Sequence, residues 1–365
     1  MSEKIIFLPT FGNRPAELIG RDEVIEGFQK GLSQPIGHPN RATLLIGQRG
    51  MGKTALLLEF ADIAERLGYV VARASAADSI LEDLIGAIQL NGSKFIKEKP
   101  KVKGVSAGAL GFSLGLTFTE ELDKQLSFQN KLLLMLNELE KHKKGVVILV
   151  DEIQASGASM RVLTTSYQHL VGERKNIAIA MAGLPHAISS ILSDEVLTFF
   201  NRAKKIILNP LPLNSISIYY AKVFKELGKK ISVKNLELAV ELTRGYPYLL
   251  QLIGFYLLEY AGTAHEITGD HIELANTSAR RDMIESIYEP VVKTLSNKDM
   301  KFLIAMSKDD GISRISDIKT RLKINDSMVQ AYRRRLLEAG VISAERRGEL
   351  AFTLPYFNDY LSNSL

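Results

Sequence analysis

The chain has 365 residues, with 46 Lys and Arg against 41 Asp and Glu, and a formal net charge of +5. Hydrophobic residues make up 46% of it, and it contains no cysteine and no tryptophan. This apolar fraction excludes a wholly disordered chain, and a length above about 250–300 residues predicts more than one domain. The absence of cysteine excludes disulfide scaffolds, thiolate metal sites and thiol nucleophiles.

The sequence shows no targeting or membrane signal. Its first residues carry Glu3 and only a short apolar run, which is the wrong pattern for a signal peptide. The longest apolar stretch, 246–260, is shorter than the roughly 20 residues that cross a bilayer. We therefore expect a cytoplasmic protein without membrane contact. HExxH and GxSxG patterns are also absent, which excludes the metalloprotease and serine hydrolase classes that carry them.

Between residues 41 and 210, short apolar runs alternate with helical periodicity. The runs are partly β-branched and bounded by glycine or charge, as expected for strands buried on both faces of a parallel sheet. Their alternation with helices predicts an α/β fold with right-handed crossovers. The predicted strands are 43–46, 69–74, 146–150, 177–181 and 205–208, and the predicted helices are 53–67, 79–91, 128–143 and 161–171.

One stretch, 101–118, departs from this pattern. Apolar residues alternate strictly from Leu110 to Phe118, which predicts a β-hairpin inserted before the next helix. The hairpin either covers a sheet edge or a helix, or it forms an association surface for a partner or a second copy of the chain.

A glycine-rich loop follows the first predicted strand and precedes a predicted helix. Its pattern is GxxxxGK[ST], in the strand–loop–helix setting that phosphate binding needs. Glycines allow backbone N–H groups to point at a phosphate, and the helix N-terminus adds a positive partial charge. We predict that Lys53 bridges the β- and γ-phosphates of ATP and that Thr54 ligates Mg²⁺. The candidate nucleotide-binding residues here are Gly47, Gln48, Arg49, Gly50, Met51, Gly52, Lys53, Thr54 and Ala55.

A second part of the candidate site follows the apolar strand 146–150, which ends in Asp151 and Glu152. Open α/β sheets bind ligands at the carboxyl ends of their strands. We predict that Asp151 holds Mg²⁺ through its water shell. Glu152 is the candidate catalytic base, which orients or activates the water that attacks the γ-phosphate.

Two other positions carry weaker signals. Arg202 precedes the last predicted strand. It either reaches the γ-phosphate of a neighbouring subunit as a catalytic arginine, or it belongs to a solvated basic turn. Gly20 and Arg21 open an early helix, where they either wrap the base of the nucleotide or only start the helix.

The remaining sequence divides into a helical region and a basic tail. Helical spacing runs from 213 to 288, with breaks at Gly228, 245–247 and Gly262. Residues 291–365 hold 13 Lys and Arg against 9 Asp and Glu, so nearly all of the net charge lies there.

The tail has the element order of a winged helix. Three predicted helices, 297–306, 316–322 and 327–339, precede two predicted strands, 341–343 and 349–353. The third helix either fits a DNA major groove or, as in other winged helices, binds protein. The candidate DNA contacts are Ser327, Gln330 and Arg334 on the helix, with Arg346 and Arg347 on the wing.

The order of these motifs resembles that of the AAA+/STAND ATPases, and in particular the bacterial and archaeal ATPases related to the origin recognition complex and to transposition helper ATPases. The segments that carry the resemblance are GRDE (20–23), GQRGMGKT (47–54), VVILVDE (146–152), AGLP (182–185), FFNR (199–202) and RGYPYLLQ (244–251). It implies a P-loop parallel sheet of the AAA+/ASCE type, an all-α lid and a C-terminal winged helix. It also implies that Pro247, in a Gly-x-Pro of the lid, touches the nucleotide.

The chain departs from the family pattern at two positions. Related ATPases place Asn, Ser or Thr where this chain has Ala182, in order to sense the γ-phosphate, and Arg244 does not stand in the usual lid pattern. These departures predict slow turnover, suited to a nucleotide-state switch.

We expect three domains: a P-loop ATPase domain (1–212), a helical lid (213–288) and a winged helix (289–365). The leading prediction is a cytoplasmic Mg²⁺–ATP-dependent ATPase that associates with double-stranded DNA. The alternative is a STAND-like signalling switch whose winged helix and hairpin bind protein, with slow or no turnover. A protein partner or a homo-oligomer is compatible with both.

Overall fold

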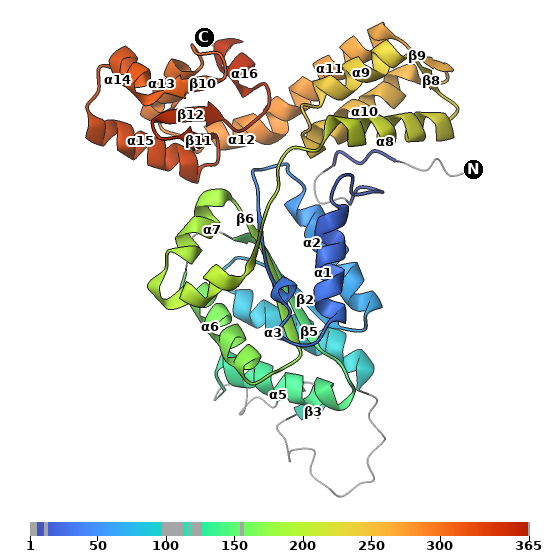
Figure 1. Cartoon of the computed structure of the whole chain (residues 1–365), viewed down its shortest axis with the longest axis vertical. Helices are drawn as coiled ribbons and strands as arrows, with labels where there is room; N and C mark the ends of the chain where they lie inside the picture. Colours follow the sequence, from blue (N-terminus) through green and yellow to red (C-terminus); the bar gives the residue numbers. More distant parts are fainter. Residues whose placement is uncertain are drawn as a thin grey trace, which may run out of the picture. The chain divides into compact units, whose positions relative to one another are not determined.

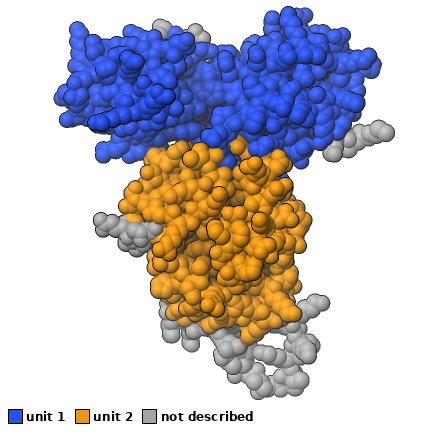
Figure 2. Space-filling model, in the orientation of Figure 1, with its two compact units in different colours: residues 1–20, 48–55, 208–365 blue, residues 21–47, 56–207 orange. Residues whose placement is uncertain are grey.

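The computed structural model of the chain describes residues 6–10, 14–96, 112–114, 117–118, 126–153 and 157–363. These residues form two compact units, which Figure 2 shows in two colours. We call residues 21–47 and 56–207 the sheet unit, and residues 1–20, 48–55 and 208–365 the helical unit. The glycine-rich loop therefore belongs mostly to the helical unit. The expected domain boundaries after residues 212 and 288 stay a prediction.

The sheet unit contains a parallel sheet of five strands in the order β2-β5-β6-β1-β7. Each strand pairs with its neighbour in parallel. This confirms the predicted α/β fold, and β6 is buried along its whole length, as its unbroken apolar sequence requires. The strands are β1 (Ala42–Ile46), β2 (Val70–Ser75), β5 (Val146–Ile153), β6 (Ile177–Gly183) and β7 (Lys204–Ile207).

Helices cover both faces of this sheet. They are α1 (Asp22–Ser33), α2 (Lys53–Arg66), α3 (Ile80–Gly92), α5 (Phe128–Lys141), α6 (Ala158–Gly172) and α7 (Pro185–Leu192), with short 3₁₀ segments η1 (Pro39–Arg41), η2 (Ser93–Phe95) and η3 (Glu195–Arg202). Figure 1 shows α1 and α2 on one side of the strands and α6 and α7 on the other. Val146, Ile148 and Val150 of β5 share a core with residues of α3, α5 and α6. Val147 and Leu149 alternate with them and are buried against the opposite layer.

The register of the sheet aligns the carboxyl ends of three strands. Met181 of β6 lies opposite both Leu44 of β1 and Val150 of β5. Asp151 therefore follows at the same edge of the sheet at which β1 ends at Ile46. Ligands of α/β sheets bind at this edge.

The predicted insertion is described only in part. Two short strands, β3 (Phe112–Leu114) and β4 (Thr117–Phe118), pair in antiparallel fashion, with Phe112 opposite Phe118. The rest of the stretch 101–118 lies outside the described residues.

The helical unit continues from Leu208 with the predicted run of helices. They are α8 (Leu213–Glu226), α9 (Val233–Leu242), α10 (Pro247–Ala261), α11 (Gly269–Met283), the π-helical turn η4 (Ile284–Tyr288) and α12 (Glu289–Val292). Two short parallel strands, β8 (Lys230–Ile231) and β9 (Glu266–Ile267), lie between them. Proline stands at the first position of α10, where its missing N–H costs nothing.

The C-terminal residues of the helical unit contain the three predicted helices and the two predicted strands. They also contain a third strand and a final helix that the sequence pattern did not predict. The elements are α13 (Asn297–Met306), β10 (Ile312–Arg314), α14 (Ile315–Leu322), α15 (Asp326–Glu338), β11 (Ile342–Arg346), β12 (Glu349–Phe352) and α16 (Phe357–Asn363). The strands form an antiparallel sheet in the order β10-β12-β11. Asn325 caps α15 by accepting a hydrogen bond from the Met328 N–H at 2.9 Å.

Candidate functional site

The glycine-rich loop runs from the end of β1 to the start of α2. Gly50 and Gly52 have φ angles of 74° and 82°, which glycine adopts without the steric cost that other residues meet. Lys53 is the first residue of α2, and its ammonium group donates a hydrogen bond to the Gln48 carbonyl at 2.8 Å. Met51 is buried in the middle of the loop. The loop is thus folded back on itself, with its lysine held over its own backbone.

The first residue of the loop is fixed to the sheet. The Gly47 N–H donates to the Gly183 carbonyl at 3.3 Å, at the end of β6. A side chain at Gly183 would bring a Cβ to 3.1 Å from the Ile153 carbonyl oxygen. Ala182, the residue before it, is fully buried. The end of β6 therefore has the apolar Ala182 and the backbone of Gly183 at the position where related ATPases are expected to place a polar side chain.

Asp151 and Glu152 form a kink near the end of β5. The register of β5 against β6 shifts between Val150 and Ile153, and Glu152 has a φ of 53°. One carboxylate oxygen of Asp151 accepts a hydrogen bond from the Glu152 N–H at 2.8 Å. A non-glycine residue in the left-handed region costs about 1–2 kcal/mol, and such strain is common at functional sites. The kink leaves Glu152 exposed to solvent and Asp151 half-buried.

The Gly245-Tyr246-Pro247 turn contacts the loop within the helical unit. Tyr246 is buried, and its hydroxyl group donates a hydrogen bond to the Arg49 carbonyl. Its ring lies over Gly50, so that a Cβ at that position would collide with it. The turn predicted to touch the nucleotide therefore lies beside the predicted phosphate loop, and Pro247 follows the contacting residue directly.

Gly20 lies near the same turn. It has a φ of 61°, and a Cβ there would lie 3.3 Å from Pro212 and 3.7 Å from Leu211. The Leu211 N–H in turn donates to the Gly245 carbonyl at 2.7 Å. Arg21 belongs to the sheet unit, where it precedes α1. Burial of the Arg21 guanidinium lowers its pKa below the ordinary value.

Arg202 lies at the opposite edge of the sheet. It is the last residue of η3, it is exposed, and β7 begins two residues later with Lys204 opposite Thr43 of β1. The loop begins at Gly47, four residues along β1 from Thr43, which corresponds to about 13 Å at 3.3 Å per residue. Arg202 therefore lies far from the start of its own loop, and both of its predicted roles, a contact with a neighbouring subunit and a solvated turn, stay predictions.

The donor set at these positions fits a nucleotide with Mg²⁺. Glycine-rich backbone, a lysine amine and a helix N-terminus suit phosphate, and a hydroxyl with a carboxylate suits Mg²⁺, which keeps most of its ligands from water and phosphate. Among the described residues no three His, Asp or Glu side chains gather as a metal cage. The Thr54 hydroxyl and the Asp151 carboxylate are donors of this kind, and their assignment as Mg²⁺ ligands stays a prediction.

Comparison with known proteins identifies the part of the chain that carries these residues. Residues 17–179 match the AAA ATPase domain family. This segment is therefore similar to an AAA ATPase domain. Residues 285–361 match a second family, a domain of unknown function, DUF8462. No curated protein matches the chain in sequence.

Similarity in fold to solved structures extends beyond residues 17–179. The Walker-type ATPase PABY2304 of Pyrococcus abyssi is 19% identical, with a TM-score of 0.67 over 96% of this chain and 97% of its own. The ORC2 protein of Aeropyrum pernix, solved in ADPNP–ADP complexes, is 14% identical, with a TM-score of 0.61 over 97% and 95%. Its ADP form gives a TM-score of 0.54 at the same identity. The chain therefore has the fold of these P-loop ATPases over nearly its whole length.

Outside residues 17–179, the predicted DNA contacts lie on exposed surface. Ser327, Gln330 and Arg334 are three, then four, residues apart on α15, and all are exposed. This spacing places them on one face of the helix. Arg346 and Arg347 are exposed at the turn between β11 and β12. The structure thus presents each predicted contact to solvent.

The third arginine of the run 333–335 has a different role. Arg335 reaches Asp299 of α13, with two of its nitrogens at 3.1 Å and 2.6 Å from one carboxylate oxygen. Ser296 donates to the other oxygen at 2.6 Å. Burial raises the pKa of Asp299, but hydrogen bonds from Arg335 and Ser296 outweigh it and hold the pKa below its ordinary value. Arg335 therefore joins α15 to α13.

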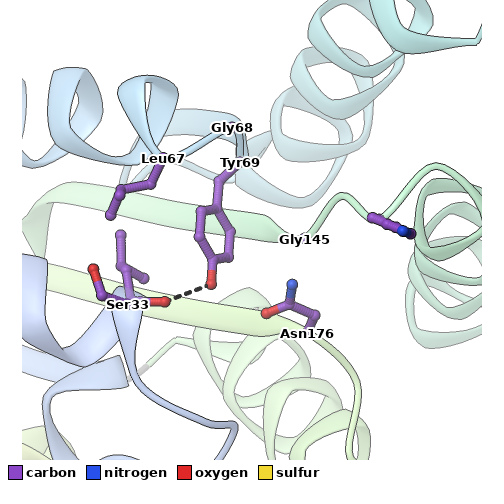
Figure 3. Close-up of a pocket in the computed structure, with 8 residues that line it drawn as sticks. Ser33, Leu67, Gly68, Tyr69, Gly145 and Asn176 are labelled. Carbon is purple, nitrogen blue, oxygen red and sulfur yellow. Dashed lines mark hydrogen bonds between the residues drawn. The ribbon is translucent and has the colours of Figure 1, made fainter.

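A surface hollow in the sheet unit lies away from the loop. Figure 3 shows it at Tyr69, Gly145 and Asn176, which precede β2, β5 and β6. Its volume is about 370 Å³. The Tyr69 hydroxyl donates to the Leu32 carbonyl at 2.9 Å. The hollow is at the amino edge of the sheet, opposite the edge where the loop of the AAA ATPase domain begins.

Two contacts of the structure were not predicted from the sequence. The sequence pattern names Pro247 as the contacting residue of the turn, whereas the structure places Tyr246, a bulky aromatic between glycine and proline, against the loop. The pairing of Arg335 with Asp299 had no local signal, because the two residues are 36 positions apart.

No helix in the described part of the chain is long and apolar enough to span a membrane.

Proposed function

We propose that the AAA ATPase domain binds Mg²⁺–ATP and hydrolyses it slowly. The observation that carries this proposal is the loop 47–54 between β1 and α2, together with Asp151 and Glu152 at the sheet edge where β1 ends. Lys53 would leave the Gln48 carbonyl to meet the β- and γ-phosphates. Bound Mg²⁺ would supply positive charge against the phosphate oxygens, with Thr54 and Asp151 as its protein ligands.

Glu152 would act as the base. As a water oxygen bonds to the γ-phosphorus, Glu152 accepts a proton of that water, and the bond from phosphorus to the β,γ-bridging oxygen breaks to give ADP and phosphate. Its left-handed backbone supports this role, because strain at a residue is retained where its side chain must point in one direction. The apolar Ala182 and the remote Arg202 leave the γ-phosphate with few other stabilising groups, which favours slow turnover by an isolated chain.

We propose that Arg202 completes the site of a neighbouring copy in a homo-oligomer. Its exposure and its position at the amino edge of the sheet support a contact in trans. In this arrangement the arginine stabilises the charge that develops on the phosphate, and turnover rises with protein concentration.

The residues 213–363 are proposed to move as one body with the nucleotide state. Tyr356 supports this coupling, since its ring lies under Arg280 at 3.8 Å and under Arg244 at 5.4 Å. Its hydroxyl donates to the Leu242 carbonyl at 2.9 Å. Tyr288 packs edge-on against Phe357 at 5.2 Å between ring centres. These contacts would carry a shift of α8–α12 to the C-terminal helices and strands.

The C-terminal residues are proposed to be a winged helix that binds duplex DNA. The exposed face of α15 and the arginines of the β11–β12 turn support this, because side chains on such a helix read base edges while wing arginines meet phosphates. Gly20, Arg21 and Pro247 are proposed to lie against the nucleotide base or sugar. The absence of cysteine supports a cytoplasmic location.

A second candidate function is a signalling switch in which the same surfaces bind protein. The antiparallel pair β3 and β4 favours it, since two short strands inserted after η2 offer an extra pairing edge.

ATP turnover with and without duplex DNA, with subunit mass measured in both nucleotide states, separates these functions. Stimulation by duplex, with affinity that falls steeply with salt, supports the DNA-associated ATPase. If the chain binds nucleotide but has no affinity for duplex DNA at low salt, the DNA-associated ATPase is refuted and the signalling switch is favoured.

A further inference from the structure

Tyr246, in the turn before α10, contacts the loop 47–54 directly. The tyrosine is the residue before α10, and it is 2% exposed. Its hydroxyl donates to the Arg49 carbonyl, and its ring occupies the space that a side chain at Gly50 would need. Burial raises the pKa of this phenol well above its ordinary value, so that the hydroxyl stays protonated and remains a donor.

This hydrogen bond determines the direction of the next N–H group. The Arg49 carbonyl and the Gly50 N–H belong to one peptide group, and in a trans peptide they point in opposite directions. A tyrosine that holds the carbonyl therefore directs the Gly50 N–H away from itself. Gly50 is the middle of the candidate phosphate loop, where inward N–H groups bind phosphate.

The tyrosine is itself firmly held. The Gly245 carbonyl accepts a hydrogen bond from the Leu211 N–H at 2.7 Å, and the Gly245 N–H donates to the Thr243 hydroxyl at 3.2 Å. Gly245 has a φ of 70°, and a Cβ there would lie 2.6 Å from the Leu211 carbonyl oxygen. These two hydrogen bonds and the close approach of Leu211 to Gly245 hold the backbone of the turn, and the turn places the Tyr246 phenol against the loop.

We propose that Tyr246 is a positioning residue of the nucleotide site, which orients the Arg49–Gly50 peptide so that the Gly50 N–H is aimed at phosphate. The inference rests on the proposed nucleotide binding. It gives the Gly-x-Pro turn a role through its middle residue, and it gives Gly50 a second reason to be glycine: the tyrosine ring lies where its side chain would be.

Tyr246→Phe removes the hydroxyl alone, and Tyr220→Phe is its matched control. Tyr220 of α8 is also buried, and its hydroxyl donates to the carbonyl of Leu250 in α10 at 2.7 Å, not to the loop. Both variants lose one buried hydrogen bond to a backbone carbonyl. We expect Tyr246→Phe to raise the Kd for ATP about two- to tenfold, the range of one hydrogen bond. Its KM rises with kcat unchanged, and Tyr220→Phe leaves the Kd at the wild-type value.

A second measurement is independent of nucleotide. Hydrogen exchange of peptides that span 48–52 in the nucleotide-free chain becomes faster in Tyr246→Phe and stays unchanged in Tyr220→Phe. Gly50→Ala and Gly52→Ala place a methyl group on two left-handed residues, but a Cβ at Gly52 meets nothing within 4 Å. Gly50→Ala therefore lowers the thermal midpoint more than Gly52→Ala, and this excess disappears in a Tyr246→Ala background.

The outcomes distinguish the inference from the function on which it rests. If Lys53→Ala does not bind ATP while Tyr246→Phe binds ATP as tightly as the wild type, the inference is overturned and the proposed function stands. Lys53→Ala that binds ATP normally overturns both. An equal rise in Kd for both tyrosine variants shows only a structural role and also overturns the inference.

Discussion

Removal of the side chains of the adjacent arginines 334 and 335 is expected to change stability to very different extents. Arg335 pairs with a carboxylate, Asp299, that is only 3% exposed, while the Arg334 side chain is 76% exposed and stands 4.0 Å from Glu338. Arg335→Ala leaves Asp299 with its two Ser296 hydrogen bonds but without its cation. Arg334→Ala removes a solvated charge. The pair is a matched test, since both residues lie on α15 one position apart.

The magnitude follows from the contacts. Hydrogen bonds to charged groups contribute about 1.5–3 kcal/mol, and loss of a fully buried partner costs about 3–5 kcal/mol. Because Arg335 is 42% exposed and Ser296 stays in place, we expect the lower range, about 2 kcal/mol. Arg334→Ala should change stability by less than about 0.5 kcal/mol, as is usual for an exposed pair.

Hydrogen exchange measured by mass spectrometry is the suitable assay, because it reports α13 and α15 separately from the rest of the chain. A loss of about 2 kcal/mol corresponds to about 30-fold faster exchange of their protected amides. The effect should depend on pH. Since the folded pKa of Asp299 lies below the unfolded value near 3.9, its contribution is present at neutral pH and is lost as pH falls through the folded pKa. The difference between wild type and Arg335→Ala therefore shrinks below about pH 4. Unchanged protection of α13 in Arg335→Ala at pH 7 would refute the pairing.

Four further predictions concern the site and the surface. Lys53→Ala should abolish ATP binding in calorimetry, because the loop loses its cation, and a measurable heat of binding would contradict the assignment. Glu152→Gln should bind ATP and stop phosphate release, whereas unchanged turnover would show that another group is the base. Glu152→Gly should also stop turnover but keep or raise stability by up to about 1 kcal/mol, since glycine relieves the left-handed strain; a lower thermal midpoint contradicts this. Alanine at both Arg346 and Arg347 should reduce the slope of log K against log salt for duplex binding by about 1.8, and an unchanged slope excludes the wing from phosphate contact.

The local elements of the chain were predictable because they depend on residues close in sequence. The apolar runs became the five parallel strands, and the pattern GxxxxGK[ST] became a loop with two left-handed glycines between a strand and a helix. The position of Asp151 and Glu152 at a strand end also followed from the apolar run before them. In each case one strand, one turn or one helix contains all the residues that decide its form.

The tertiary structure alone decided which distant residues meet. The contact of Tyr246 with Arg49 joins residues 197 positions apart, and one of three consecutive arginines, Arg335, pairs with the buried carboxylate of Asp299. Arg202 was placed at the amino edge of the sheet by the parallel pairing of β7 with β1. The +5 net charge and its concentration in the last 75 residues were evident from the sequence. Which of those charges face solvent and which hold the fold depends on burial and pairing partners, which no local pattern specifies.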